Sequence, residues 1–196
     1  GEVRPTTVSP GRAAAKRAGL LVLEDCCQAD GGSYRGRRLG SWGDAGAFSF
    51  NDFKIMSCGE GGAVVTSDRR VYERALIQHD SGITFRSFSG ELAEPIFIGH
   101  QYRATELMGA VLRMQLGRLE GILADLRRMK RELVGALTGE RGVRFAPVND
   151  EAGDCGVVAV FQFDTEAAAR SFAKSPGVGG VVPFDTGKHV YTNWDP

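Results

Sequence analysis

Two residues of this 196-residue sequence have side chains suited to catalysis, and each follows a predicted strand. Asp25 lies just beyond the apolar run 20–23, which is typical of a strand buried on both faces. Lys54 comes shortly after a second predicted strand, 46–50. Open α/β sheets bind ligands outside the carboxyl ends of their strands, so both side chains are well placed for chemistry. Each also has a plainer explanation: a carboxylate that caps a loop, and a solvated lysine.

Further polar and glycine residues lie close to these two. Gln28 follows Asp25 by three residues and is placed to face the same crevice. Glycine accounts for 27 of the 196 residues, about twice its average usage, and gathers in segments 31–46 and 59–62. The second cluster, GEGG, matches neither a dinucleotide fingerprint nor a P-loop, so it is a weak signal by itself. Clustered glycines mark backbone that turns tightly or approaches a neighbour closely.

Three segments become informative when they are taken together. They are EDCCQADGG (24–32), GDAGAFSFNDFK (43–54) and GEGGAVVTSD (59–68). In order, spacing and residue type they resemble the DegT/DnrJ/EryC1/StrS family of pyridoxal-phosphate sugar aminotransferases, which have the fold-type I, aspartate-aminotransferase-like architecture. Segments 99–119 and 189–196 resemble further blocks of the same family. The resemblance therefore spans nearly the whole chain from residue 19.

The resemblance implies a role for each polar residue near the two strands. Lys54 would form a Schiff base with the cofactor aldehyde and, once released, would shuttle the proton. Asp25 would contact the pyridine nitrogen and keep the ring protonated, and the pyridinium would in turn depress the pKa of Asp25. Gln28 would contact the hydroxyl side of the ring, and Ser49 would hydrogen-bond the phosphate.

In this family a loop of the neighbouring subunit also reaches the phosphate, usually through the asparagine of a G-x-N-Y-R pattern. The matching position here is Gln101, in the segment 99–103 (GHQYR), where the amide is one methylene farther out. The resemblance therefore implies a homodimer with shared active sites, in which Gln101 acts in trans. Arg103 is expected to form a structural ion pair. Asp30 stands where the family often has histidine, and its role is open.

Apolar spacing and capping residues predict the elements that position these side chains. The strongest helical signal opens at Thr105 and ends near Gly139, because its leucines recur every three or four residues over most of its length. Residues 80–98 lack periodicity and are expected to form a long loop. The other expected elements are helices over 9–19, 68–79 and 165–175, and strands over 20–23, 46–50, 62–66 and 157–163.

This order of elements predicts an α/β fold with a mostly parallel, helix-flanked sheet. Residues 1–134 are expected to form part of a large pyridoxal-phosphate-binding domain that ends in the long interdomain helix, and residues 135–196 the start of a small α+β domain. The family's Gly-Thr/Ser phosphate cup and stacking aromatic residue lie upstream of the block that contains Asp25, and nothing in the first 24 residues matches them. The chain is therefore expected to be the central part of a longer enzyme.

Composition argues against several other classes of protein. The 24 basic and 24 acidic residues give a net charge of zero, which disfavours nucleic acid or an anionic membrane as the partner. No apolar run approaches the roughly 20 residues that span a bilayer. Four cysteines without C-x-x-C spacing, and no signal peptide, favour reduced thiols in the cytoplasm. The three histidines are too dispersed for a metal site, and His189 is left open between a substrate contact and a structural role.

The leading hypothesis is an aminotransferase that moves an amino group from glutamate or glutamine to a keto-sugar, including a nucleotide-sugar, or to a keto-cyclitol through the Lys54 Schiff base. A pyridoxal-phosphate-dependent sugar dehydratase is the second hypothesis. Some such relatives replace the lysine with histidine, so Lys54 argues against it. The third hypothesis is a catalytically incomplete chain that serves as a partner or scaffold for a full-length subunit, and it rests on the missing phosphate cup.

Overall fold

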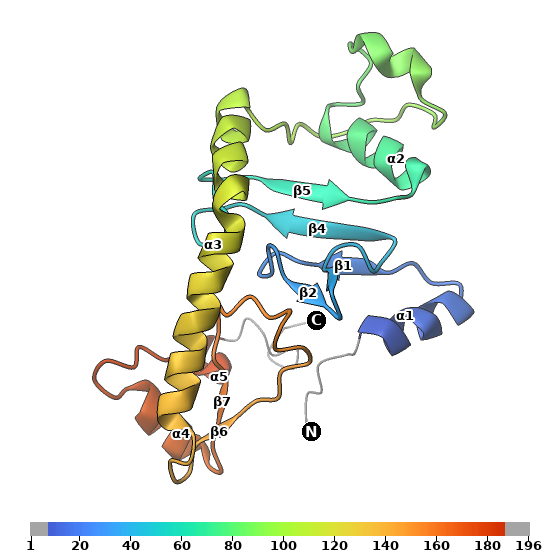
Figure 1. Cartoon of the computed structure of the whole chain (residues 1–196). Coiled ribbons are helices and arrows are strands. Elements are labelled where there is room, and N and C mark those ends of the chain that lie inside the picture. Colours follow the sequence, from blue (N-terminus) through green and yellow to red (C-terminus); the bar gives the residue numbers. More distant parts are fainter. Residues whose placement is uncertain (1–7, 187–196) are drawn as a thin grey trace. The chain divides into compact units, whose positions relative to one another are not determined.

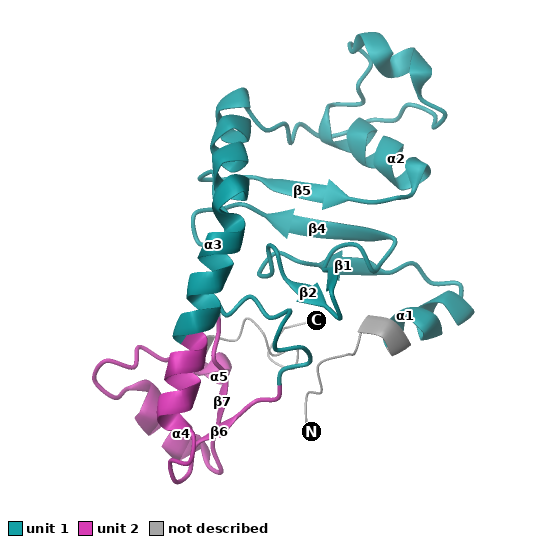
Figure 2. Ribbon diagram, viewed as in Figure 1, with its two compact units in different colours: residues 1–129, 148–157 teal, residues 130–147, 158–196 magenta. Residues whose placement is uncertain are grey.

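The computed structural model describes residues 8–186 (Figure 1). The chain divides into two compact units (Figure 2). Unit 1 comprises residues 1–129 and 148–157, and unit 2 comprises residues 130–147 and 158–196. The long helix contributes its first part to unit 1 and its last turns to unit 2. The domain boundary that the sequence predicts at residue 134 lies within the same helix.

Unit 1 contains a three-stranded sheet in the order β1-β4-β5 (Figure 1). The central strand β4 (Ala45–Ser49) is parallel to β1 (Leu23–Asp25) and antiparallel to β5 (Gly62–Val65). The predicted α/β class is confirmed, although a mostly parallel sheet was expected and one of these two pairings is antiparallel. The cause is the short connection 50–61, because a parallel return needs a crossover, usually helical, that carries the chain back to the starting edge.

The first strand differs from its prediction. β1 begins at Leu23 rather than Leu20, and Leu20, Leu21 and Leu23 are 63%, 82% and 69% exposed. The expectation of a strand buried on both faces is therefore wrong for this chain. Among the described strands β1 pairs only with β4, at one edge of the sheet, and only the end of the apolar run enters that pairing.

Two helices of unit 1 begin where the sequence predicts, and the first, expected from Ser9, begins one residue earlier, at Val8. α2 (Arg69–His79) is capped by Asp68, whose carboxylate accepts a hydrogen bond from the backbone of the first turn at 3.1 Å. α3 (Glu106–Leu137) follows Thr105, whose hydroxyl accepts a corresponding bond at 3.3 Å. α1 (Val8–Arg17) occupies the first helical segment of the sequence. Local capping chemistry therefore determines where α2 and α3 begin.

The core of unit 1 joins α3 to the loop that carries Lys54. Its buried members are Phe50, Met56, Leu119, Leu123 and Cys155. The two leucines belong to the periodic series of α3 and are 7% and 0% exposed. Because Phe50 and Met56 bracket Lys54 along the chain, this core fixes both ends of the lysine loop.

A short hairpin precedes the central strand. β2 (Ser33–Tyr34) pairs antiparallel with β3 (Arg37–Arg38). Arg35 and Gly36 connect them with φ values of 50° and 75°, and a two-residue turn with both φ values positive suits the twist of a hairpin. Gly36 adopts this conformation at low cost, so part of the glycine cluster serves a turn.

The expected loop 80–98 contains the 3-10 helix η1 (Ser87–Glu91) and is tied to α2. Glu73, a buried residue of α2, accepts hydrogen bonds from the backbone N–H groups of Ala93 and Glu94, both at 2.9 Å. A buried carboxylate therefore orders this segment. Because the contact joins residues about twenty positions apart, no local pattern in the sequence reveals it.

In its described residues, unit 2 contains a two-stranded antiparallel ribbon and short helices. β6 (Arg144–Phe145) pairs with β7 (Phe161–Gln162), and α4 (Glu166–Ala173) and α5 (Pro183–Thr186) follow. The strand expected over 157–163 is shorter than predicted, because only two of its residues find a partner in β6. Neighbouring aromatic rings pack with centroids 5.1–5.3 Å apart; they belong to Phe145, Phe161, Phe163 and Phe172.

Two expectations concern the remaining sequence. The family block 189–196, with His189, lies outside the described residues. Within the described part of the chain, none of the helices has the length and apolar character that a membrane crossing requires.

Candidate active site

The carboxyl ends of β1 and β4 lie at one edge of the sheet, because these two strands are parallel. Asp25 is the last residue of β1, and its Cα pairs with that of Ala47. Ser49 is the last residue of β4 and lies two positions beyond Ala47, so the side chains of Ser49 and Ala47 share a face of the sheet. The structure therefore places two predicted site residues at the same edge.

Lys54 lies in the loop that leaves this edge. Its backbone N–H donates to the Asn51 carbonyl at 3.1 Å, and the Asn51 side chain accepts from the Phe53 N–H at 3.1 Å. The Cys58 N–H donates to the Phe50 carbonyl at 3.0 Å, which closes the loop onto the end of β4. These bonds hold Lys54 half-buried in an ordered turn.

Asp25, Ser49 and Lys54 are called the strand-end site from here on. The pKa of Asp25 lies below its ordinary value, first because its carboxylate accepts hydrogen bonds from the side chain and the backbone N–H of Cys27, the latter at 3.1 Å. The positive charge of Lys54 lowers it further. A low pKa was expected from the cofactor, and Cys27 supplies a cause within the chain. Asp25 is exposed and ionised at neutral pH.

Gln28 is exposed in the turn that follows Asp25. The Ala29 N–H donates to the Cys26 carbonyl at 2.9 Å to close this turn, and the Cys26 N–H donates to the Ala47 carbonyl at 2.9 Å. The turn is thereby held against the central strand. Burial raises the pKa of the Cys26 thiol to about 12, so this thiol fills space as a neutral group.

Glu24 has a role that sequence reasoning missed. Its carboxylate accepts hydrogen bonds from the backbone N–H groups of Gly40 (2.8 Å), Trp42 (2.5 Å) and Gly43 (2.6 Å). Adjacent side chains on a strand point to opposite faces, so Glu24 fixes this loop while Asp25 faces the other side. The two glycines are the signal that could have revealed it, because small residues let several N–H groups converge on one carboxylate.

Gln101 belongs to another part of unit 1. It forms an isolated antiparallel bridge with Asp80, a residue that is 4% exposed. Asp80 pairs with Arg86 at 2.7 Å and with Arg103 at 3.3 Å, which confirms the structural ion pair expected for Arg103. Within the described residues no hydrogen bond or ion pair joins Gln101 to the strand-end site. The structure therefore groups Asp25, Ser49 and Lys54 but leaves Gln101 apart from their contacts.

Asp30, whose role the sequence left open, is buried beside the lysine loop. It is 1% exposed, and its Oδ2 accepts a hydrogen bond from the Met56 N–H at 3.3 Å. Burial raises the pKa of Asp30, while the Met56 hydrogen bond and the charge of Lys54 act in the opposite direction. Its Oδ1 is buried with no hydrogen-bond partner among the described residues.

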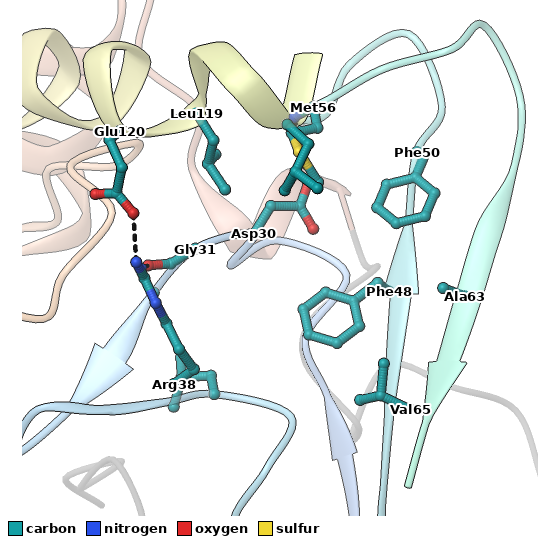
Figure 3. Close-up of a pocket in the computed structure, with 13 residues that line it drawn as sticks. Asp30, Gly31, Arg38, Phe48, Phe50, Met56, Ala63, Val65, Leu119 and Glu120 are labelled. Carbon is teal, nitrogen blue, oxygen red and sulfur yellow. Dashed lines mark hydrogen bonds and ion pairs between the residues drawn. The ribbon is translucent and has the colours of Figure 1, made fainter. Parts of the chain in front are cut away.

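A cavity of about 360 Å³ adjoins Asp30 in unit 1 (Figure 3). Figure 3 shows Asp30 next to Met56 and across from Phe48 and Phe50. Arg38 and Glu120 form an ion pair at the same cavity. The remaining lining is glycine and apolar side chains: Gly31, Gly32, Leu39, Ala63, Val65, Leu116 and Leu119.

The residues of the strand-end site fit the chemistry of pyridoxal phosphate. The ionised carboxylate of Asp25 suits a protonated pyridine nitrogen, and the half-buried amine of Lys54 suits an aldehyde. Ser49 adds a hydroxyl at the same edge. Opposite Ser49, a Cβ at Gly62 would lie 2.7 Å from the Phe48 carbonyl oxygen, so glycine allows the two strands to approach closely there.

Comparisons with known proteins show what the chain is similar to. A model of the DegT/DnrJ/EryC1/StrS aminotransferase family matches residues 4–175. L-glutamine:2-deoxy-scyllo-inosose aminotransferase from Streptoalloteichus tenebrarius is 37% identical over 139 residues, which are 68% of this chain and 32% of that protein. dTDP-3-amino-3,4,6-trideoxy-alpha-D-glucose transaminase from Streptomyces venezuelae is 35% identical over 140 residues, 71% of this chain and 35% of that protein.

A solved structure shares the fold. The crystal structure of DesI in the presence of its TDP-sugar product superimposes with a TM-score of 0.67 and 28% sequence identity. The match covers 82% of this chain and 40% of that one. The chain spans about a third of the length of the curated relatives it matches.

Proposed function

Because the chain belongs to the DegT/DnrJ/EryC1/StrS aminotransferase family, we propose that it carries the lysine-bearing part of a pyridoxal-phosphate-dependent aminotransferase. The observation that supports this most is the strand-end site, where the charge of Lys54 acts on an ionised Asp25 at the shared edge of β1 and β4. The proposed reaction moves an amino group from glutamine or glutamate to a keto-sugar or keto-cyclitol.

Lys54 and Asp25 have distinct tasks in this reaction. Bound pyridoxal phosphate supplies an aldehyde for covalent attachment and a ring that accepts electron density from the substrate. The Lys54 amine provides the attachment point and, when released, holds or moves a proton at Nζ. The Asp25 carboxylate stays ionised because of its hydrogen bonds from Cys27, and so it keeps a protonated ring nitrogen in place.

The remaining cofactor contacts are assigned by position. Ser49 at the end of β4 is proposed to hydrogen-bond the phosphate, and Gln28 to contact the hydroxyl side of the ring. Gln101 is proposed to reach the phosphate bound by a second copy of the chain, because its own bridge is to Asp80. The proposal therefore includes a homodimer with shared active sites.

The substrate class is proposed from the relatives. One relative is named for 2-deoxy-scyllo-inosose, a cyclitol, with L-glutamine, and another for a dTDP-linked amino sugar. We extend these classes to the present chain as a ketone on a cyclitol or on a sugar, nucleotide-linked sugars included. Glutamine is the amino donor to test first, and glutamate is the alternative.

Covalent attachment of the cofactor tests the proposal. Pyridoxal phosphate added to the chain should give an absorbance band near the visible region, and borohydride should then fix the cofactor to the Lys54 peptide, as read by mass spectrometry. Lys54→Ala should lose both signals. Lys16→Ala, which removes an exposed lysine of α1, is the matched control and should keep them. A band retained in Lys54→Ala would show that the attachment point is wrong.

Amino transfer itself is measured as pyridoxamine formation from glutamine or from glutamate. The assay is run on the chain alone and with any co-encoded upstream chain, because the matched segments cover only about a third of each relative. Formation of pyridoxamine in either arrangement supports the aminotransferase proposal. A colourless chain that co-purifies with a longer homologue would instead support a partner or scaffold role.

A further inference from the structure

Asp30 has no place among the cofactor contacts, yet it is buried beside the lysine loop (Figure 3). We propose that Asp30 is a positioning residue for Lys54: its Oδ2 anchors the lysine loop through the Met56 N–H, and its Oδ1 is a counter-charge for the ammonium of Lys54 when that amine carries no cofactor. This inference rests on the proposed function, because it concerns the lysine that the proposal makes the attachment point.

The anchoring contact joins the loop that follows β1 to the loop that follows β4, at the carboxyl ends of these two parallel strands. The Met56 N–H donates to Asp30 Oδ2 at 3.3 Å across 26 residues of sequence, and Met56 follows Lys54 by two positions. Asp30 is itself held in place, since its backbone carbonyl accepts from the Cys155 thiol at 3.7 Å. The lysine loop is therefore fastened to a residue that cannot move freely, which limits where the Lys54 amine can lie.

The second oxygen of Asp30 is the observation that calls for a cation. Buried carboxylate oxygens without a partner are unfavourable and rare in native proteins, so Oδ1 requires an explanation. Arg38 lines the same cavity, but its guanidinium donates to the Gly31 carbonyl and to Glu120. Lys54 lies two residues before Met56, whose N–H is bound by Asp30, and the positive charge of Lys54 acts to lower the pKa of Asp30. A lysine amine next to this oxygen would satisfy it.

Glu120 lines the same cavity as Asp30 and is paired with Arg38. The other titratable groups whose charge interacts with Asp30 are thiols. Cys26 and Cys27 belong to its own loop, and Cys155 comes from the segment 148–157. Burial raises the pKa of Cys26 and of Cys155, so both are neutral at physiological pH. The pKa of Cys27 is also raised, first by its hydrogen bond to Asp25. The charge that Asp30 meets from this side is therefore that of Lys54.

Asp25 and Asp30 thus have different proposed roles near Lys54. Asp25 is exposed and is the residue proposed to contact the cofactor ring, whereas Asp30 is buried and contacts the lysine loop through the Met56 N–H. The role of Asp30 requires no proton transfer, because the proton stays on Nζ. Its effect is to keep the released ammonium near its attachment point, which shortens the path back to the cofactor.

The counter-charge is tested by titrating Asp30 in the cofactor-free chain. The 13Cγ resonance of Asp30, identified by its loss in Asp30→Asn, is followed against pH by NMR. Removing the lysine charge with Lys54→Met should raise the titration midpoint of Asp30 by about one pH unit, since a nearby positive charge favours the ionised carboxylate. Lys54→Arg keeps the charge and should restore most of the difference.

Lys16→Met is the matched control, because it removes an exposed lysine of α1 and should leave the Asp30 midpoint unchanged. An Asp30 midpoint that is equal in the wild-type chain and in Lys54→Met would overturn the counter-charge. A shift of equal size in Lys16→Met would also overturn it, because the effect would then be one of net charge.

The anchor is tested by hydrogen exchange at the Met56 amide, again without cofactor. Asp30→Ala removes the acceptor and should speed exchange about tenfold, whereas Asp30→Asn retains an amide oxygen and should preserve most of the protection. Glu73→Gln changes a buried carboxylate of α2 and should leave Met56 unaffected. Unchanged exchange in Asp30→Ala would overturn the anchoring role.

These measurements separate the two proposals. If borohydride fails to label Lys54 while the Asp30 midpoint still responds to Lys54→Met, the proposed function fails and the geometry around Asp30 stands. If labelling succeeds while that response is missing, the proposed function stands and the role of Asp30 is overturned.

Discussion

Unit 1 buries two aspartates to nearly the same degree and places them in opposite electrostatic surroundings. Asp80, in the segment after α2, is 4% exposed, and Asp30, beside the lysine loop, is 1% exposed. The Asp80 carboxylate contacts two guanidinium groups, those of Arg86 and Arg103. The Asp30 carboxylate accepts a single backbone hydrogen bond, from Met56.

The pKa values of the two residues move in opposite directions as a result. The pKa of Asp80 is lowered, first by its hydrogen bond from Arg86, and this bond together with the charges of Arg86 and Arg103 outweighs burial, which acts to raise it. The pKa of Asp30 is raised because burial exceeds its hydrogen bond and the charge of Lys54. Burial alone therefore does not decide what an aspartate does. A carboxylate in contact with two guanidinium groups holds the chain together, whereas one that has only a backbone hydrogen bond can serve a neighbouring group.

Asp25 supplies an exposed reference for this comparison, and its replacement should have the largest effect. Asp25→Asn removes the ionised carboxylate from the proposed ring contact and should slow pyridoxamine formation by about a hundred- to a thousandfold, with the urea midpoint of unfolding unchanged. Asp52→Asn changes an exposed aspartate of the lysine loop and is the matched control. An equal loss of rate in both variants would contradict a specific role for Asp25.

Asp80→Asn should have an intermediate effect, and on structure rather than on chemistry. It removes the charge that holds Arg86 and Arg103, so segment 80–103 should open more often, and brief trypsin treatment should cleave after Arg86 about ten times faster. Mass spectrometry of the fragments gives the rate. Asp30→Asn is the control of similar burial. If Asp30→Asn accelerated cleavage after Arg86 as much as Asp80→Asn does, the idea that only Asp80 holds this segment would be contradicted.

The smallest effect should be on the pH dependence of folding stability. Ionised Asp80 should stabilise the fold and ionised Asp30 should destabilise it. A lowered pKa means that the stability from Asp80 is present above its ordinary pKa of 3.8 and is lost as pH falls through the lowered value. A raised pKa means that ionised Asp30 opposes folding at neutral pH, and that this penalty is relieved as pH falls through the raised value towards 3.8.

Urea midpoints of unfolding, measured between pH 3 and pH 7, show whether each aspartate stabilises or destabilises the fold. The urea midpoint of Asp80→Asn should lie below that of the wild type at neutral pH, and this difference should become smaller as pH falls. The urea midpoint of Asp30→Asn should increase relative to that of the wild type as pH rises, because the variant lacks the charge that opposes folding. Parallel pH profiles for the two variants would contradict the opposite shifts.

Much of the fold could be predicted because its signals are local. Asp68, Thr105 and Thr165 each precede a helix and accept a hydrogen bond from its first turn. The residue type and the apolar spacing that follows were enough to predict these helix starts. The first strand was predicted wrongly, because an apolar run such as 20–23 does not reveal how many strands will cover it.

The candidate site was only partly predictable. Asp25 and Lys54 were found from residue type at predicted strand ends, together with the resemblance to a family. The burial of Asp30 and the pairing of Asp80 could not be predicted, because both depend on contacts from segments that are remote or lack periodicity. Cys27 was missed because its influence on Asp25 is a matter of side-chain orientation.

One feature of β1 has a mechanical consequence. The carboxylate of Glu24 accepts hydrogen bonds from three backbone N–H groups of the loop before β4. These bonds attach that loop directly to β1. Glu24 and Asp25 are joined by a single peptide unit and face opposite sides of the sheet. A change in the position of that loop would therefore pull on the backbone that carries Asp25, so the loop on one face of the sheet helps to set the position of the carboxylate on the other.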